Sequence, residues 1–280
     1  MNIFLTGCTS YIGKYLAISF INQGDNVIGT SRTDPKIKNK KFKFIKHDLS
    51  LSPISKLNTK IDFFVHVAGR RMIKGQKVGE YISSNVLVSY NLQKMIKKFN
   101  PKLTIYTSSR SIYGEVKNPI LRENTNILNP DVYGQTKFLG EKILEEAGNT
   151  ISLRLSTVLC KGAPGWISNV YHRLSLNKKI EMVDTKINNF IHIIDVFNII
   201  NFFFKKKKFF TDQFNICSSK TTSSKKIVYL MKKLLNSNSK IVQKPRKENY
   251  YTISNNKLKK YYLTLPAEEA IYKFVNDFGK

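Results

Sequence analysis

The stretch 6-TGCTSYIG-13 decides the fold, because it stands directly after a short apolar segment and directly before a helical pattern. Residues 2–6 (NIFLT) are predicted to form a first strand, and residues 11–23 have the spacing of a helix. Gly7 permits the tight turn between them and lets the backbone approach a phosphate group. Gly13 lets the helix pack closely. A strand, a glycine turn and a helix in this order are typical of the first unit of a dinucleotide-binding fold.

The alternation between strand and helix patterns continues to about residue 156. Further strands are predicted at 26–30, 42–45, 61–69, 102–109 and 150–156. Long helical patterns occur at 79–98 and 132–146. Because β-α-β alternation is typical of a parallel sheet with helices on both faces, we expect ligands to bind beyond the carboxyl ends of these strands.

Beyond residue 156 the pattern is looser. Helices are expected near 166–176, 223–236 and 266–278, and a short strand followed by a helix is expected in 187–203. The sequence therefore predicts an α/β protein whose residues 1–156 form a Rossmann-type, doubly wound parallel sheet. Residues 157–280 are expected to form mainly a smaller C-terminal substrate-binding lobe, with some segments returning to the sheet.

The composition is that of a globular protein, with 41% apolar residues in a chain of 280. No apolar run reaches the length of a membrane span, and the N-terminus lacks the basic lead of a signal peptide. The three cysteines (Cys8, Cys160 and Cys217) are far apart and have neither a disulfide nor a metal-ligand spacing. We therefore expect a cytoplasmic protein without a metal site or a membrane span.

The formal charge of +28 is the feature that favours a polyanionic partner. The lysines are spread over the whole length beside many Asn and Ile residues, which is also the composition that A/T-rich codons produce. The densest cluster, 205-KKKK-208, lies between two groups of phenylalanines and is interpreted as a solvated turn after a buried helix. Because none of the usual nucleic-acid modules can be read in the sequence, we expect no nucleic-acid partner.

The second predicted strand ends in 28-IGTSR-32, and this end indicates the type of dinucleotide. An acidic residue at this place would hold a ribose 2′-hydroxyl, but the strand ends in Ser31 and Arg32 instead. A hydroxyl and a guanidinium are suited to a 2′-phosphate. We therefore expect NADP(H) as the favoured cofactor, with NAD(H) as the alternative.

Several polar or small residues are expected at the other strand ends. Asp48 in 47-HDLS-50 is placed to accept a hydrogen bond from an adenine amino group. The small residues of 66-HVAG-69 let a cofactor pass close to the backbone, and hydroxyl groups gather in 107-TSSRSIYG-114. Asn85 stands inside a helical pattern, where asparagine is a poor helix former, so it is either a functional residue or a solvated surface one.

The stretch 131-DVYGQTKFLGEK-142 places Tyr133 four residues before Lys137, on one face of a predicted helix. The spacing Tyr-x-x-x-Lys is a common chance pattern on its own. The glycine turn and the hydroxyl-rich strand end upstream raise it to a candidate catalytic couple.

Together these stretches resemble the short-chain dehydrogenase/reductase superfamily, in its extended branch of NAD(P)-dependent epimerases and dehydratases that act on nucleotide-sugars. The similarity covers nearly the whole chain. It also includes 153-LRLSTV-158, 190-FIHIIDV-196, 214-FNIC-217 and 265-LPAEEAI-271. The resemblance implies a Rossmann-type fold, a dinucleotide cofactor and a nucleotide-sugar substrate.

The resemblance assigns the chemistry to Ser109, Tyr133 and Lys137. Tyr133 would be the general acid/base, and Lys137 would lower the pKa of its phenol and bind the nicotinamide ribose. Ser109 would hydrogen-bond the reacting oxygen.

Two larger sets of binding residues follow from the motifs and the resemblance. The expected cofactor-binding residues are Gly7, Ser10, Tyr11, Ile12, Gly13, Ser31, Arg32, Asp48, Leu49, Ala68, Gly69, Asn85, Thr107, Tyr133, Lys137 and Leu155. The expected substrate-binding residues are Arg70, Ser109, Arg110, Thr157, Lys161 and Arg173.

Departures from the family pattern narrow the reaction. Arg110 and Ser111 stand where sugar dehydratases carry an Asp-Glu pair, so we expect no dehydration. Asn188 stands where epimerases usually carry an arginine for the substrate diphosphate, so other basic residues must hold that group. Because the chain is short for an epimerase and Arg32 favours NADPH, the leading hypothesis is reduction of a nucleotide-activated 4-keto sugar, with Tyr133 as proton donor.

Three other hypotheses stay open. The first is a nucleotide-sugar 4-epimerase with tightly bound NAD, and the second is a reductase of a non-sugar carbonyl. The third is a non-catalytic dinucleotide sensor or RNA-associated protein. The expected partners are a nucleotide-sugar and a second copy of the chain. The resemblance implies that this homodimer forms through a four-helix interface built from the helices near 79–98 and 132–146.

Overall fold

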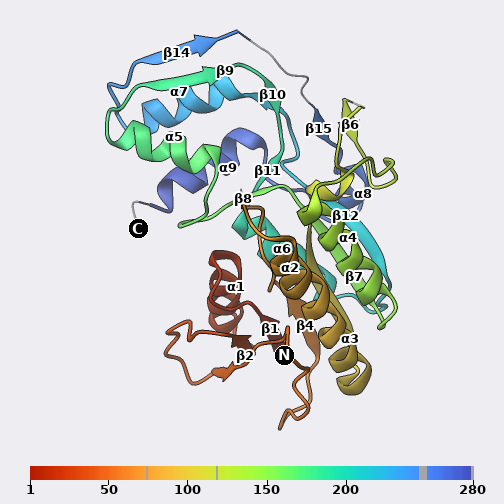
Figure 1. The fold of residues 1–280 in the computed structure, drawn as a ribbon. Helices are drawn as coiled ribbons and strands as arrows, with labels where there is room; N and C mark the ends of the chain where they lie inside the picture. The colour runs from red at the N-terminus through yellow and green to blue at the C-terminus, as the bar shows by residue number, and fades with distance from the viewer. Residues whose placement is uncertain (74, 118, 246–250, 279–280) are drawn as a thin grey trace. The chain divides into compact units, whose positions relative to one another are not determined.

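The structure is a computed structural model that describes residues 1–73, 75–117, 119–245 and 251–278 (Figure 1). The chain divides into two compact units, which are described separately. The first unit comprises Met1–Glu115, Asn126–Arg154 and Ile199–Phe214. The second unit comprises Val116–Thr125, Leu155–Asn198 and Asn215–Lys280.

A seven-stranded sheet forms the centre of the first unit. Its strands are β1 (Asn2–Thr6), β2 (Asn26–Ser31), β3 (Phe42–Lys46), β4 (Phe63–His66), β5 (Leu103–Ser109), β7 (Thr150–Leu155) and β12 (Asp212–Ile216). The strand order is β12-β7-β5-β4-β1-β2-β3, and β3, β2, β1, β4 and β5 pair in parallel. The order reverses direction between β1 and β4, which is where the doubly wound fold binds its ligand. The expected α/β fold with a parallel sheet is confirmed.

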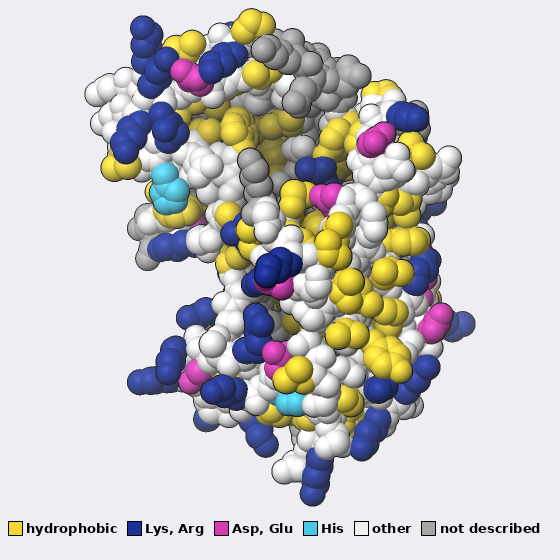
Figure 2. Space-filling model, in the orientation of Figure 1, with side chains coloured by type: hydrophobic (Ala, Val, Ile, Leu, Met, Phe, Trp, Pro, Cys, Tyr) yellow, Lys and Arg dark blue, Asp and Glu magenta, His cyan; other side chains and the backbone are white. Residues whose placement is uncertain are grey.

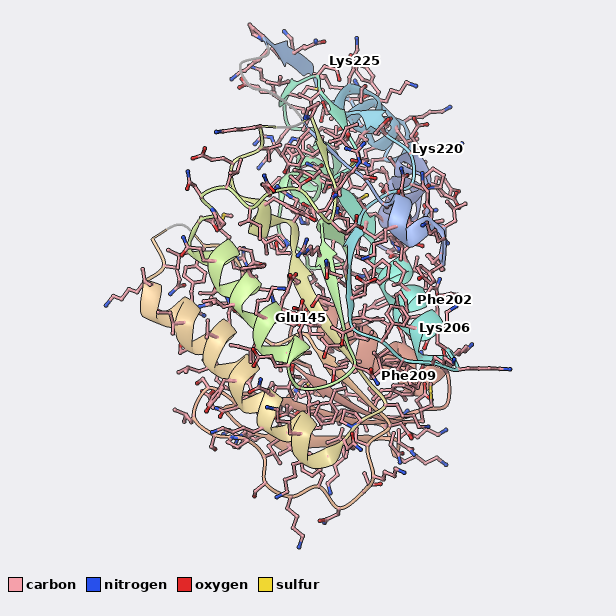
Figure 3. All side chains as sticks on the ribbon, turned by 90° about the vertical axis from the view of Figure 1, so that its right-hand side faces the viewer. Glu145, Phe202, Lys206, Phe209, Lys220 and Lys225 are labelled. Carbon is pink, nitrogen blue, oxygen red and sulfur yellow. The ribbon has the colours of Figure 1, made fainter. Side chains whose placement is uncertain are left out.

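Helices cover both faces of this sheet, which explains why its central strands are continuous apolar runs. These helices are α1 (Tyr11–Asn22), α3 (Val88–Phe99), α4 (Val132–Glu145) and α6 (Ile193–Phe204). The helices α3 and α4 lie on one side of the sheet, and α6 lies on the other (Figure 3). Neighbouring side chains of β4 point to opposite faces and pack on helices of opposite layers. Phe63 stacks on Phe204 of α6 at 4.0 Å, and Phe64 lies 6.5 Å from Phe99 of α3.

The helical region predicted at 79–98 contains an irregular turn. It consists of α2 (Val78–Tyr81), a π-helical turn η1 (Ile82–Leu87) and α3. The predicted helical segment is therefore confirmed, and its middle part is a π turn instead of an α-helix. The π turn contains Asn85, and such turns in helices are frequent at functional sites.

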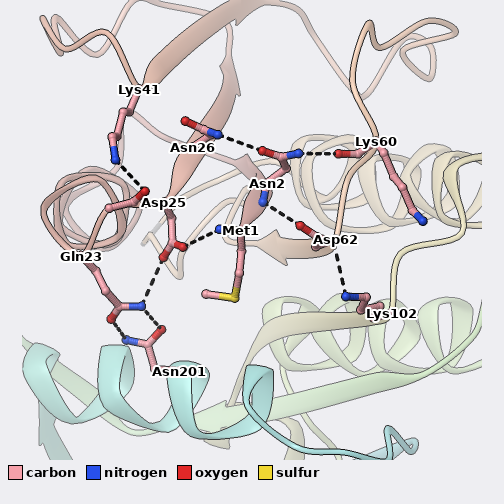
Figure 4. A network of polar contacts seen from close by, with 11 residues as sticks. Met1, Asn2, Gln23, Asp25, Asn26, Lys41, Lys60, Asp62, Lys102 and Asn201 are labelled. Atoms are coloured by element: carbon pink, nitrogen blue, oxygen red, sulfur yellow. Dashed lines mark hydrogen bonds and ion pairs between the residues drawn. The ribbon is translucent and has the colours of Figure 1, made fainter.

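A polar network connects the amino ends of β1 and β2, which lie at the opposite end of these strands from the glycine turn (Figure 4). The Met1 ammonium group forms an ion pair with Asp25 at 2.8 Å. The amide of Gln23 donates to Asp25 and also pairs with the amide of Asn201 on α6, whose nitrogen lies 2.7 Å from the Gln23 oxygen. This network fastens α1 and α6 to the first strands, and the carboxyl ends of the strands carry the glycine turn.

The second unit contains short strands and helices around a separate apolar core. The strands are β6 (Ile120–Leu121), β8 (Thr157–Leu159), β9 (Ile180–Val183), β10 (Lys186–Ile187), β11 (Phe190–His192), β13 (Thr222–Ser223), β14 (Ile241–Lys244) and β15 (Thr252–Ile253). The helices are α5 (Trp166–Ser175), α7 (Ser224–Leu234), α8 (Asn256–Lys259) and α9 (Ala267–Asn276). The core between α5, α7 and α9 includes Leu174, Met231 and Phe274. The helices predicted near 166–176, 223–236 and 266–278 are thus confirmed.

Candidate functional site

The loop after β1 brings its backbone against the loop after β4. Gly7 has a positive φ of +69°, and a methyl group on it would lie 2.7 Å from the Ala68 amide nitrogen. A methyl group on Gly13 would collide with the Gly7 carbonyl oxygen. Ser10 takes the place of the middle glycine of the family pattern and caps α1. Its hydroxyl donates to the Gly7 carbonyl oxygen at 2.8 Å and accepts from the Gly13 amide at 3.0 Å.

A cleft of about 420 Å³ lies at the carboxyl ends of β1, β2 and β4. Among the expected cofactor residues, the cleft is lined by Gly7, Ser10, Ser31, Arg32, Asp48, Leu49, Ala68 and Gly69. This volume lies within the usual range of cofactor pockets. Because the lining combines bare backbone, hydroxyl groups and a guanidinium, it fits the phosphates and the adenosine of a dinucleotide.

Polar residues that the sequence analysis did not select also line the cleft. They are Thr9, Thr30, Thr33, His47, Ser50, Ser83 and Ser84. His47 and Ser50 lie close to Asp48 in the sequence, and Thr33 follows Arg32. These three residues could therefore have been predicted from their position beside expected cofactor-binding residues. Ser83 and Ser84 lie in the π turn, which the regular helical pattern did not reveal.

Asp48 is oriented by its own loop. Its Oδ1 accepts from the Ser50 amide at 2.9 Å and from the Ser50 hydroxyl at 2.7 Å. Partial burial raises the pKa of Asp48, but these hydrogen bonds and the charges of Arg32 and His47 outweigh it and hold the pKa below its ordinary value. The carboxylate is therefore an ionised acceptor beside two basic side chains.

The candidate catalytic residues stand on two neighbouring elements of the first unit. Ser109 ends β5 and begins the short helix η2 (Arg110–Tyr113), and Tyr133 lies in the first turn of α4. The Asp131 side chain caps α4 by accepting from the Gly134 amide at 2.7 Å. A side chain at Gly134 would collide with the carbonyl oxygen of Ser111, so this glycine lets α4 lie directly against η2.

Burial raises the pKa of Tyr133 above its ordinary value. The neighbouring Ser109 side chain and the charge of Arg110 oppose that rise. Arg110 is itself half-buried, and burial lowers the pKa of its guanidinium. Ser109 and Arg110 thus both favour the ionised form of the phenol.

Lys137 lies one helical turn after Tyr133 and is almost fully buried. Its Nζ lies 4.2 Å from the centre of the Tyr106 ring. Burial lowers the pKa of Lys137 to about 7, and the carboxylate of Glu141 acts in the opposite direction. A Cβ on Gly69 would lie 3.7 Å from the same Nζ, so the lysine reaches the loop that lines the cleft.

Asn85 is buried and connects the cleft with α4. Its Oδ1 accepts from the Arg70 amide at 2.7 Å, and its Nδ2 donates to the Thr136 hydroxyl at 3.0 Å. The Thr136 hydroxyl donates to the Tyr133 carbonyl oxygen at 2.9 Å. The alternative of a solvated surface asparagine is therefore wrong, because Asn85 is 1% exposed.

A second buried chain of hydrogen bonds passes through His66. Thr6 Oγ1 accepts from the Val67 and Ala68 amides at 3.1 and 3.0 Å and lies 2.7 Å from His66 Nδ1. Since both amides donate to Thr6, its hydroxyl proton points to Nδ1, which leaves the ring proton of His66 on Nε2. Nε2 faces the Ser89 hydroxyl at 3.4 Å. Burial lowers the pKa of His66 to about 3, and the charge of Lys137 adds to this effect.

The remaining expected cofactor residues have varied positions. Tyr11 and Ile12 are half-buried in the first turn of α1. Thr107 is buried, and its hydroxyl donates to the His66 carbonyl oxygen at 3.1 Å. Leu155 is the buried last residue of β7. Their contact with a dinucleotide stays a prediction.

The expected substrate residues are distributed over both units. Arg70 lines the cleft and forms an ion pair with Glu80, while Thr157, Lys161 and Arg173 belong to the second unit. The guanidinium of Arg173 donates to the Lys179 carbonyl oxygen at 2.9 and 2.6 Å. That bond already occupies part of its donor capacity, and the substrate role of these residues stays a prediction.

Asn188, which replaces the usual diphosphate-binding arginine, forms hydrogen bonds within the second unit. It is buried, its Nδ2 donates to the Ile253 carbonyl oxygen at 2.8 Å, and its Oδ1 accepts from the Ile253 amide at 3.0 Å. An amide with both ends bonded to backbone holds β15 in place and has little capacity left for a phosphate.

Metal-ligand clusters and membrane-spanning helices are both absent from the described parts of the chain. No group of three or more His, Cys, Asp or Glu side chains that could hold a metal ion occurs there. None of the helices described is both long enough and apolar enough to span a membrane.

Comparison with known proteins identifies the family. Residues 3–217, which are more than half of the chain, match the NAD dependent epimerase/dehydratase family. The chain belongs to this family. The resemblance to that family is thereby confirmed, and membership implies a dinucleotide of the NAD(P) type, which the cleft fits.

Several relatives in this family are epimerases by name. UDP-glucose 4-epimerase of Yersinia enterocolitica is 32% identical over 164 residues, which are 52% of this chain and 48% of that protein. The uncharacterized UDP-glucose epimerase YtcB of Bacillus subtilis is 28% identical over 160 residues, or 51% of this chain and 50% of that protein. The chain thus spans about half the length of the curated relatives it matches.

The fold is also similar to solved structures over nearly the whole chain. UDP-glucuronic acid 4-epimerase from Bacillus cereus in complex with NAD has a TM-score of 0.82 at 20% identity, covering 99% of this chain and 96% of that chain. At this level of identity the likeness establishes the fold.

The buried His66 predicts an acid-sensitive fold. Its pKa is about 3 in the folded protein and 6.5 in its ordinary state, so the unfolded chain binds a proton first as the pH falls. The neutral His66 ring contributes fully to the free energy of unfolding above pH 6.5. This contribution is lost progressively toward pH 3, by about 1.4 kcal/mol per pH unit. We expect urea unfolding from pH 7 to pH 5 to show this loss and His66→Gln to have a shallower slope.

The solvent-exposed His172 provides the control for this prediction. The variant His172→Gln should keep the slope of the unmodified protein, because its side chain is not buried. An identical slope for His66→Gln and the unmodified protein would show that the buried ring does not titrate in this way.

Proposed function

We propose that the protein is a nucleotide-sugar 4-epimerase whose site consists of the dinucleotide cleft and the residues Ser109, Tyr133 and Lys137. The observation that carries this proposal is the placement of Ser109 at the end of β5, beside Tyr133 on α4, with Lys137 one turn further and next to the cleft loop. The names of the relatives support a UDP-hexose as the substrate. The sugar C4 is the reacting centre.

The chain would supply the proton transfer and the positioning. The Tyr133 phenolate takes the proton from the C4 hydroxyl group, and the resulting phenol later returns it, while Ser109 donates a hydrogen bond to the same oxygen. The charge of Lys137 favours the phenolate form of Tyr133 and attracts ribose hydroxyl groups. A nicotinamide bound in the cleft would accept the C4 hydride and return it to the opposite face of the sugar. The net change is inversion at C4, without consumption of cofactor.

Dehydration of the sugar is less compatible with the site. Arg110 and Ser111 stand after Ser109, and a guanidinium next to the phenol does not remove a proton from carbon. Arg110 favours ionised Tyr133 instead, which serves hydride abstraction from an alcohol.

Reduction of a 4-keto sugar with NADPH is the second candidate. The observation that favours it is the adenosine end of the cleft, where β2 ends in Ser31 and the lining includes Arg32 and His47. Two basic side chains at this place suit a 2′-phosphate. A reductase would then consume one NADPH for each sugar.

A single assay separates these functions. We expect UDP-glucose or UDP-glucuronic acid to be converted to its C4 epimer with no net change in nicotinamide absorbance. The variant Tyr133→Phe should lower kcat by about 10² to 10⁴-fold while the dinucleotide Kd changes little. Tyr229→Phe, which alters an exposed tyrosine of α7, should leave kcat unchanged.

Other outcomes of the assay would contradict the epimerase. Stoichiometric loss of NADPH with a 4-keto nucleotide-sugar would establish the reductase. Arg32→Ala should then reduce the preference for NADPH over NADH by about tenfold or more, since charge-assisted hydrogen bonds contribute about 1.5–3 kcal/mol. Dinucleotide binding with no turnover, unaffected by Tyr133→Phe, would indicate a sensor.

We also propose that two copies associate through α3 and α4. Hydrophobic side chains gather over these helices on the face shown in Figure 2, and Leu87, Tyr90 and Leu139 are between 42% and 48% exposed. An apolar face of this kind on two adjacent helices forms a four-helix interface when a second copy is related by twofold symmetry.

Sedimentation tests this association. The unmodified protein is expected to sediment as a dimer, and Leu139→Glu should convert it to a monomer because it places a charge on the apolar face. Leu51→Glu, at an 82% exposed position elsewhere in the same unit, serves as the control and should remain dimeric. A monomeric unmodified protein at micromolar concentration would contradict the proposal.

A further inference from the structure

A buried ion pair lies one helical turn beyond Lys137. Glu141 is 0% exposed and Arg154, on β7, is 5% exposed. The Arg154 Nη2 donates to Glu141 Oε2 at 2.9 Å, and its Nε lies 3.2 and 3.3 Å from the two carboxylate oxygens. The pair therefore holds the carboxylate in a single orientation.

The same arginine also reaches the segment that carries Ser109. Arg154 Nη1 donates to the Tyr113 hydroxyl at 3.1 Å, and its guanidinium lies 5.3 Å from the centre of that ring. Tyr113 is the last residue of η2, the short helix that begins after Ser109. The ion pair thus links α4, β7 and the turn after β5, which together position Ser109 and Tyr133.

Lys137 needs a nearby negative charge to stay protonated where it lies. Removing an ammonium from water favours its neutral form, and a carboxylate close by counteracts this effect. The groups that act on Lys137 come from three elements: the Tyr106 ring on β5, the neutral His66 on β4 and Glu141 on α4. Of these, Glu141 supplies the carboxylate, which is paired with Arg154.

Tight packing keeps Glu141 within range of Lys137. A Cβ on Gly140 would lie 2.5 Å from the Tyr106 hydroxyl oxygen and 3.0 Å from the Ser89 hydroxyl oxygen, so α4 lies directly on β5 and α3. Both Lys137 and Tyr106 respond to the charge of Glu141. Water has no room to screen the interaction between these groups.

We propose that Glu141 is the counter-charge that favours the protonated form of Lys137 in its buried position, and that Arg154, held by Tyr113, orients this carboxylate. Glu141 and Arg154 are positioning residues, because they act through Lys137 and do not touch the reacting atoms. The inference rests on the proposed function only for the role of Lys137 in turnover. The protonation state of Lys137 is a property of the protein alone.

The direct test is the titration of Lys137 in the protein without cofactor. Lysine labelled with ¹³C at Cε is followed by NMR from pH 5 to pH 10, and the Lys137 signal is assigned by its absence in Lys137→Met. The unmodified protein should titrate near 7. In Glu141→Gln the midpoint should fall by about one unit or more, since the ammonium then lacks its compensating charge.

Two variants separate the charge from the packing. Glu141→Asp keeps the charge and should keep the midpoint close to that of the unmodified protein. Tyr113→Phe removes one hydrogen bond of Arg154 and leaves both charges, so it should destabilise the fold without moving the midpoint. If Glu141→Gln does not fold, the double variant Glu141→Gln/Arg154→Gln, in which two amides replace the ion pair, carries the same expectation. An unchanged Lys137 midpoint in whichever of these variants folds would overturn the proposal.

Turnover gives a second readout that a purely structural role would not produce. A fall of about one unit reduces the protonated fraction of Lys137 at pH 7 from about one half to about one tenth, so kcat should drop about fivefold. Activity of Glu141→Gln should then recover as the pH is lowered, whereas Tyr113→Phe should keep the original pH profile. A shifted NMR midpoint with turnover that does not depend on Tyr133 would refute the proposed function and leave this inference standing.

Discussion

The ammonium group of Lys137 is 4% exposed and lies between the Tyr106 ring and the loop that follows β4. Burying a cation costs several kcal/mol unless neighbouring groups compensate for the lost water. Compensation comes from the aromatic face and from the Glu141 carboxylate, which Arg154 keeps in place. The positions of β5, α4 and β7 are therefore tied to one charge, which α4 carries one helical turn after Tyr133.

Glycines make this arrangement possible because they remove side chains at the points of closest approach. Gly134 lets α4 meet η2, Gly140 lets it lie on Tyr106, and Gly7 lets the first loop lie against the loop after β4. The polar chains through His66 and Asn85 then connect the two loops with α4. The cleft and α4, which carries the proposed catalytic residues Tyr133 and Lys137, are thus joined by direct contacts.

Much of this site was predictable from local patterns in the sequence. The strand-turn-helix at Gly7 and Gly13, the basic end of β2 and the Tyr133/Lys137 spacing all depend on residues that are close in the chain. The ion pair of Glu141 with Arg154 was not predicted, because it forms only when α4 packs on the face of the sheet that contains β7. The π turn at Asn85 was not predicted for a similar reason. Asparagine is a poor helix former, and its hydrogen bond with Thr136 on another helix stabilises it in this turn.

The central claim is that C4 of a nucleotide-sugar loses a hydride to the bound nicotinamide, while the hydroxyl group on C4 loses its proton to Tyr133. The most direct measurement uses UDP-glucose carrying deuterium at C4, incubated with the purified protein and NAD⁺ in ordinary water. Mass spectrometry of the recovered C4 epimer should show that the deuterium is retained at C4, because the hydride never exchanges with solvent. Loss of the deuterium to water during epimerisation would contradict the account, since it would show that the C4 hydrogen is removed as a proton.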